Sequence, residues 1–113
     1  MSRGTLEQRG EHMGQAERPP LRKVSLDDKY THDHTSAYMT GIEALVRLPM
    51  LQRKRDVKRG LNTAGFVSGY RGSPLGSVDQ AMWKASPYLD AHQIHFQPGV
   101  NEDLAATSVW GSQ

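Results

Sequence analysis

The sequence predicts an α/β fold with an incomplete, parallel, Rossmann-like sheet, preceded by a disordered N-terminal tail. After Thr40, apolar residues follow the order helix, strand, helix, strand, helix. The strand–helix–strand part spans roughly 35 residues, which is enough for the crossover between two parallel strands. Two strands and three helices cannot cover both faces of a parallel sheet. We therefore expect this chain to be the N-terminal piece of a longer protein.

Composition limits the chain to one small domain and excludes several classes of protein. Of its 113 residues, 36% are hydrophobic, and the mean hydropathy is −0.66. No apolar run approaches the ~20 residues that span a bilayer, and the start of the chain lacks the apolar core of a secretory signal. The absence of cysteine excludes disulfides and iron–sulfur or zinc–thiolate sites within this stretch. We expect a cytoplasmic protein with no membrane partner.

Three regions follow from the distribution of apolar residues. Residues 1–24 are polar and contain few large apolar side chains, which predicts a disordered lead-in. Residues 25–39 remain polar and are predicted to be irregular or extended. Residues 40–113 form the partial α/β domain.

The first long helix is predicted from a capping box at Thr40 and Glu43, followed by apolar residues at helical spacing. Pro49 has no N–H donor, so the helix is predicted to kink or restart there. Gly60 is a typical stop. The first strand is expected over residues 62–68.

The second helix is predicted to start at Ser73 as its N-cap, with Pro74 at the first helical position. It is expected to run to about Lys84, and Ser86 and Pro87 then begin the exit. Residues 92–97 alternate apolar side chains inward and predict the second strand. After Pro98 and Gly99, Asn101 is predicted to cap the last helix.

Two loops leave the carboxyl ends of these strands: GYRGSPLG at 69–76 and PGVNED at 98–103. In a parallel sheet, ligands bind at that edge. Because both strands of a βαβ unit point the same way, the two loops must share one edge. We expect them to reach the same ligand.

Each loop also has an interpretation without a ligand. In the first loop, the glycines and the donors of a helix beginning at Ser73 suit an anion, but they also suit a tight turn alone. In the second, a functional Glu102 is expected to be partly buried at the sheet edge, whereas Asn101 and Glu102 alone fit an ordinary capped helix. Arg71 is a candidate for binding a substrate carboxylate or an exposed loop residue.

Other polar clusters are weaker candidates. His32 and His34 alternate in a polar segment, but a metal site there is disfavoured, and His92 and His95 are expected at strand ends or the surface. The basic run 53–59 suits a helix C-terminus. It is interrupted by Asp56 and lacks interleaved aromatic residues, so it does not favour nucleic-acid binding.

Three segments together, TGIEALVRLP, NTAGFVSGYRGSPLG and FQPGVNEDLAATSVWGSQ, resemble the start of the fused indolepyruvate ferredoxin oxidoreductases. These are thiamine-diphosphate enzymes of the 2-oxoacid:ferredoxin oxidoreductase group. The resemblance covers roughly residues 24–113. It implies the pyrimidine-binding domain of the thiamine-diphosphate fold and oxidative decarboxylation of an aryl-pyruvate 2-oxoacid, with coenzyme A and ferredoxin as partners.

The resemblance also implies roles for residues of both loops. Ser73 would face the 2-oxoacid, with Tyr70, Arg71 and Gly72 beside it. Glu102 would hold a proton on a ring nitrogen of the aminopyrimidine and act as the catalytic residue. The other implied cofactor-binding residues are Gly69, Pro74 and Asn101.

The departures from the family matter as much as the resemblance. The Gly-Asp-Gly…Asn signature that binds diphosphate and magnesium is absent, and so are the cysteine clusters that hold [4Fe-4S] centres. Mg²⁺ and the clusters are therefore expected on the remainder of the enzyme or a partner subunit, and this chain alone is expected to be inactive. The alternative is a non-catalytic α/β assembly or regulatory module.

Overall fold

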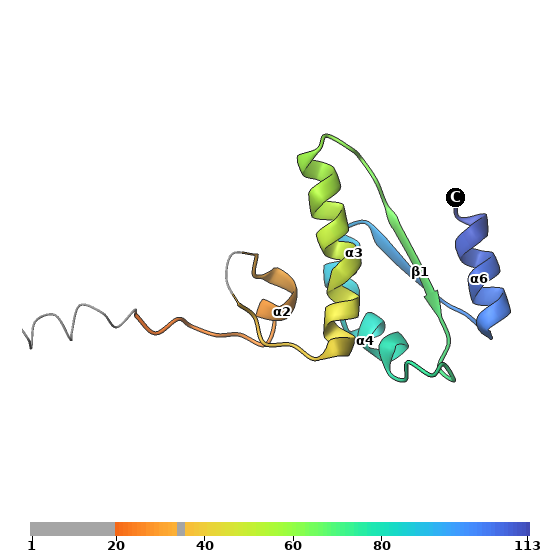
Figure 1. Ribbon diagram of the computed structural model, residues 1–113, viewed down its shortest axis with the longest axis horizontal. Coiled ribbons are helices and arrows are strands. Elements are labelled where there is room, and N and C mark those ends of the chain that lie inside the picture. The colour runs from red at the N-terminus through yellow and green to blue at the C-terminus, as the bar shows by residue number, and fades with distance from the viewer. Residues whose placement is uncertain (1–19, 34–35) are drawn as a thin grey trace, which may run out of the picture.

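The computed structural model describes residues 20–33 and 36–113, and it is a mixed α/β fold with a two-stranded parallel sheet. Figure 1 shows the elements, which are α2 (Asp28–Thr31), α3 (Gly41–Lys58), β1 (Gly65–Gly69), α4 (Val78–Lys84), α5 (Ser86–Ala91), β2 (Ile94–Pro98) and α6 (Glu102–Gly111). Most of the predicted lead-in, through residue 19, lies outside the described residues. Among the helices described here, none combines the length and the apolar character needed to cross a membrane.

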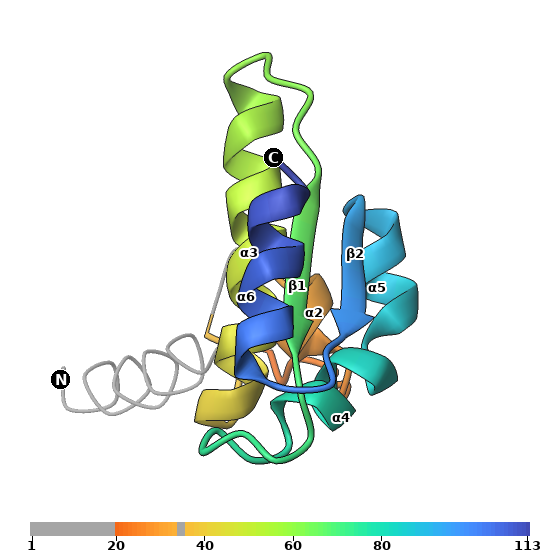
Figure 2. The ribbon, with the colours of Figure 1, turned by 90° about the vertical axis from the view of Figure 1, so that its right-hand side faces the viewer.

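The sheet lies between two layers of helix. Figures 1 and 2 show α3 on one side of β1 and α6 on the other. One core joins buried side chains of α3, α4 and α5 to β2, with Val46, Met50, Met82, Leu89 and Ile94 at its centre. The opposite face of β1 is covered by α6. The candidate site is built on this second face.

Helix α3 begins as predicted and then passes through Pro49 without interruption. The Thr40 hydroxyl accepts from the Glu43 N–H, and the Glu43 carboxylate accepts from the Thr40 N–H, so the capping box is confirmed. The predicted restart at Pro49 is wrong. Val46 and Met50 on either side of it are 0% and 1% exposed. Their packing outweighs one missing backbone hydrogen bond.

Order also begins before Thr40, within the segment predicted to be irregular. The one-turn helix α2 places Tyr30 in the core, with its ring centroid 5.3 Å from that of Tyr88. The Lys29 ammonium donates to Glu43 Oε1 over 2.6 Å, which ties α2 to the start of α3. This hydrogen bond is the main cause that lowers the pKa of Glu43 and raises the pKa of Lys29.

The region between the strands differs from the prediction in two places. Ser73 does not cap a helix: residues 71–77 form turns, and α4 begins only after Ser77, whose φ is +72°. The anion-binding helix end expected at Ser73 is therefore not formed. Residues 86–91 are a second short helix, not an exit, because Pro87 suits a first helical turn and Leu89 is buried in the core.

Candidate functional site

The two glycine-containing loops meet at the carboxyl edge of the sheet. Strands β1 and β2 pair in parallel from Gly65 opposite Ile94 to Gly69 opposite Pro98. Just beyond the last pair, the Gly99 N–H donates to the Gly69 carbonyl over 2.8 Å. The prediction that both loops share one edge is confirmed.

A side-chain hydrogen bond joins the two loops across this edge. The Tyr70 hydroxyl donates to Glu102 Oε1 over 3.0 Å. This hydrogen bond is the largest cause that raises the pKa of Tyr70 above its ordinary value, followed by burial and the Glu102 charge. Asn101 fixes the helix end that carries Glu102, because its Oδ1 accepts from the Leu104 N–H over 2.9 Å. The predicted Asn101 cap is confirmed.

Glu102 itself is exposed in this structure, although we predicted partial burial. The reason is geometric: α6 packs through Ala105, one turn further along, so its first residues project past the end of the sheet. Tyr70 engages Oε1. Among residues 20–33 and 36–113, no other side chain is hydrogen-bonded to this carboxylate. The second oxygen is therefore available to a ligand.

An open hollow of about 420 Å³ lies beside this pair, between the end of β1 and α6, and we call it the loop-edge hollow. It is lined by Ser68, Gly69, Tyr70, Ser73, Glu102, Ala105, Ala106 and Val109. The Ser68 Oγ is buried and has no hydrogen-bond partner among the described residues. A buried hydroxyl without a partner is costly unless a ligand or water completes it. The hollow thus offers a carboxylate, two hydroxyls from Ser68 and Ser73, and an apolar wall.

Two glycines allow the close packing that shapes the hollow. A Cβ at Gly72 would lie 2.8 Å from Tyr70 Cε2, so Gly72 leaves room for the tyrosine ring that reaches Glu102. A Cβ at Gly99 would lie 2.9 Å from Ala105 Cβ. Gly99 therefore lets α6 approach the end of β2, and this approach sets the position of Glu102.

Some predicted site residues lie elsewhere. The Arg71 side chain is 84% exposed, and its Nε lies 3.7 Å from Asp79 Oδ2 on α4. Neither Arg71 nor Pro74 lines the loop-edge hollow. Gly69, Tyr70, Ser73 and Glu102 do line it, and Gly72 and Asn101 support them.

Sequence reasoning missed Ser68, Gly99 and Ala105. Ser68 follows Val67 in an alternating strand, so its place on the face opposite the core was readable from the sequence. The closeness of Gly99 to Ala105 was not, because it depends on how α6 crosses the sheet. Within the described part of the chain, no group of histidine and acidic side chains is arranged to hold a metal ion; His34 lies outside it.

Comparison with known proteins assigns no family to this chain. No protein-family model matches the chain, and neither a curated protein nor a solved structure matches it.

Proposed function

We propose that this chain is the pyrimidine-binding part of a thiamine-diphosphate 2-oxoacid:ferredoxin oxidoreductase of the indolepyruvate type. The observation that carries the proposal is the Tyr70–Glu102 hydrogen bond at the carboxyl edge of a parallel sheet. It brings together the GYRGSPLG and PGVNED loops that the resemblance singles out. The two loops lie 32 residues apart in sequence at this bond.

The polar and apolar groups that line the loop-edge hollow fit the aminopyrimidine ring of the cofactor. That ring presents nitrogen acceptors and an exocyclic amino group on a flat apolar body. Glu102 supplies a carboxyl group for a ring nitrogen, and the unpartnered Ser68 hydroxyl supplies a further polar contact. Ala105, Ala106 and Val109 supply an apolar wall for the ring face.

Each loop residue then has a definite task. With the cofactor bound, Glu102 would hold a proton between its carboxyl group and the ring nitrogen, and Tyr70 would fix Oε1 by donating to it. Ser73 faces the 2-oxoacid from the first loop. Arg71 would bind the substrate carboxylate only by leaving Asp79, with which its exposed side chain is paired at 3.7 Å. When bound, thiamine diphosphate would supply a nucleophilic thiazolium carbon for the keto group of the substrate.

The remaining chemistry belongs to other parts of the enzyme. The Gly-Asp-Gly…Asn signature for diphosphate and Mg²⁺ and the cysteine clusters for [4Fe-4S] centres are absent from this sequence. The outer surface of α6 supports a covering domain: Leu104 is 50% exposed and Trp110 is 81% exposed.

Exchange of the thiazolium C2 proton with solvent deuterium tests the proposal in the full-length oxidoreductase. Glu102→Gln should slow this exchange by about a hundredfold or more, the usual range for loss of a positioned acid–base group. Asp103→Asn is the matched control. It removes the same charge from the same helical turn, outside the hollow. Exchange in Asp103→Asn should remain close to that of the wild type.

Two results would overturn the proposal. Unchanged exchange in Glu102→Gln would remove Glu102 from the chemistry. Equal slowing in both variants would show that the effect comes from the charge at the start of α6, and not from contact with the ring. Either result would withdraw the catalytic role proposed for Glu102.

A further inference from the structure

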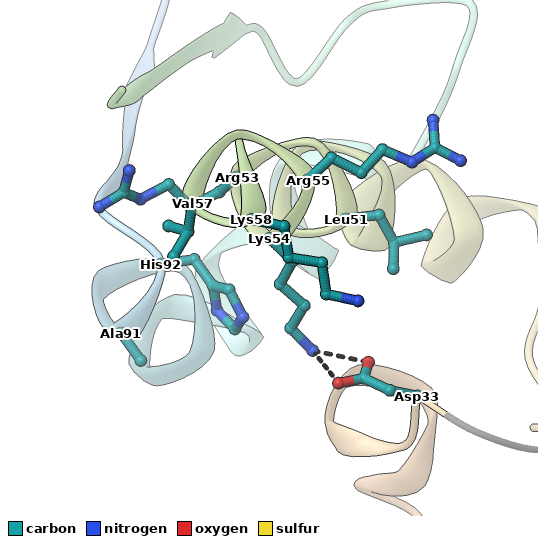
Figure 3. Close-up of a pocket in the computed structure, with 9 residues that line it drawn as sticks. All are labelled: Asp33, Leu51, Arg53, Lys54, Arg55, Val57, Lys58, Ala91 and His92. Carbon is teal, nitrogen blue, oxygen red and sulfur yellow. Dashed lines mark hydrogen bonds and ion pairs between the residues drawn. The ribbon is translucent and has the colours of Figure 1, made fainter. Parts of the chain in front are cut away.

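A second hollow, of about 670 Å³, lies away from the loop edge, and we call it the basic hollow. Figure 3 shows its lining, which consists of Asp33, Leu51, Arg53, Lys54, Arg55, Val57, Lys58, Ala91 and His92. Four cationic side chains and one carboxylate line this hollow, which gives a net charge of three positive with His92 neutral. Such a concentration of one sign in a concave surface attracts anions.

The preference of cations for a helix C-terminus explains only part of this arrangement. Arg55 and Lys58 lie in the last turn of α3, where the helix dipole favours them. The other walls come from distant parts of the chain: Asp33 follows α2, whereas His92 follows α5. Three separate segments thus enclose the space, which a solvated helix face does not require.

The single acid of the basic hollow is already engaged. Lys54 Nζ lies 2.7 and 2.8 Å from the two Asp33 oxygens, and Arg47 lies 3.6 Å from the same carboxylate. Within the part of the chain that the structure describes, neither the Arg55 side chain nor the Lys58 side chain is hydrogen-bonded or ion-paired. Figure 3 shows the Lys54 and Lys58 side chains extending to the same side of α3, with the His92 ring next to them. Arg53 already donates to the Leu61 carbonyl and to Asn62 Oδ1. Lys58 is thus the cation that extends into this space without a side-chain partner among the described residues, and it remains available to an added anion.

We propose that the basic hollow binds a small molecule that carries a diphosphate or polyphosphate group. Several cations around one concave space suit adjacent phosphates, to which lysine binds as a point charge and arginine as a fork. Leu51, Val57 and Ala91 add an apolar part for the rest of the molecule. The lining holds no phenylalanine, tyrosine or tryptophan on which successive bases stack, so single-stranded nucleic acid is disfavoured.

The proposal is independent of the thiamine-diphosphate site. The basic hollow involves the end of α3, which precedes the amino end of β1, whereas Tyr70 and Glu102 lie beyond the carboxyl end (Figure 1). The two hollows share no lining residue. A negative result in the test of one proposal therefore leaves the other proposal standing.

Isothermal titration of the chain with inorganic pyrophosphate and with ADP tests the proposal. Lys58→Gln should weaken pyrophosphate binding by roughly tenfold, the effect of losing one charge-assisted contact. Lys58 is exposed, so this variant should keep the wild-type circular dichroism spectrum. Lys23→Gln is the matched control, since it removes an exposed lysine that lies outside the basic hollow.

The proposal is supported if both probes bind and if Lys58→Gln weakens this binding whereas Lys23→Gln does not. Tighter binding of ADP than of pyrophosphate would place the nucleoside on the apolar part of the hollow. The proposal is overturned by absent pyrophosphate binding at millimolar concentration, or by equal losses in the two variants. Binding confined to oligonucleotides would also overturn it and assign the surface to nucleic acid.

Discussion

Replacing Gly99 by alanine tests whether the approach of α6 to the sheet positions Glu102. The new Cβ would lie 2.9 Å from Ala105 Cβ and 3.3 Å from both Ala105 Cα and the Asn101 carbonyl oxygen. Two of these neighbours are backbone atoms, so no side-chain rotation relieves the contact. The first turn of α6 must therefore move away from β2.

The expected cost follows from two opposing effects. Overpacking of this kind costs about 1–3 kcal/mol, and the lower flexibility of alanine in the unfolded chain offsets about 0.4–1 kcal/mol of it. We expect a net loss of about 1–2 kcal/mol in the free energy of unfolding, measured by urea denaturation. Gly111→Ala is the control in the same helix, because a Cβ there meets no atom within 4 Å; it should be neutral or stabilising.

The movement of α6 should also be visible at Tyr70. Its pKa is raised chiefly by the hydrogen bond to Glu102. In Gly99→Ala this bond lengthens, so the pKa of Tyr70 should fall toward its ordinary value. An NMR titration of the Tyr70 ring, assigned with Tyr70→Phe, measures the change. A Gly99→Ala protein as stable as Gly111→Ala, with an unchanged Tyr70 titration, would show that the Gly99–Ala105 contact does not position α6.

Three further predictions concern the scaffold. Met50→Ala should lower the free energy of unfolding by about 2–5 kcal/mol in urea denaturation, because Met50 is 1% exposed in the core; a loss below 1 kcal/mol would contradict its place there. Thr40→Ala should cost about 0.5–2 kcal/mol in the same assay through loss of the cap, and an unchanged midpoint would count against it. Hydrogen bonds from Thr63 and then Gln52 lower the pKa of Asp56. The stabilisation that the Asp56 carboxylate gives the folded protein is therefore present above the ordinary aspartate pKa and is lost as the pH falls. Asp56→Asn should flatten the acid limb of stability against pH, and an unaltered limb would contradict this.

The parts of the fold that depend on local signals were predictable from the sequence. The caps at Thr40 and Asn101 rest on side chains next to the backbone groups that they satisfy, and both are present. The parallel pairing followed from the length of the crossover. It placed Tyr70 and Glu102 at one edge before any distance was known.

The parts that depend on tertiary packing were not predictable. Pro49 breaks an isolated helix, but the buried face of α3 overrides this preference. Ser73 and Pro74 form a strong helix-start signal, yet the chain turns until Ser77 before α4 begins. The exposure of Glu102 likewise depends on Ala105, the residue through which α6 meets the sheet.

The central claim is that the loop-edge hollow receives the pyrimidine ring of thiamine diphosphate. Saturation-transfer NMR from the protein to the pyrimidine protons of added thiamine diphosphate tests it directly, because the Ala105 and Ala106 methyl groups line the hollow. We predict clear transfer in the wild-type protein and in Asp103→Asn, and strongly reduced transfer in Glu102→Gln. No transfer to the pyrimidine ring in the wild type, or the same transfer in Glu102→Gln, would contradict the account.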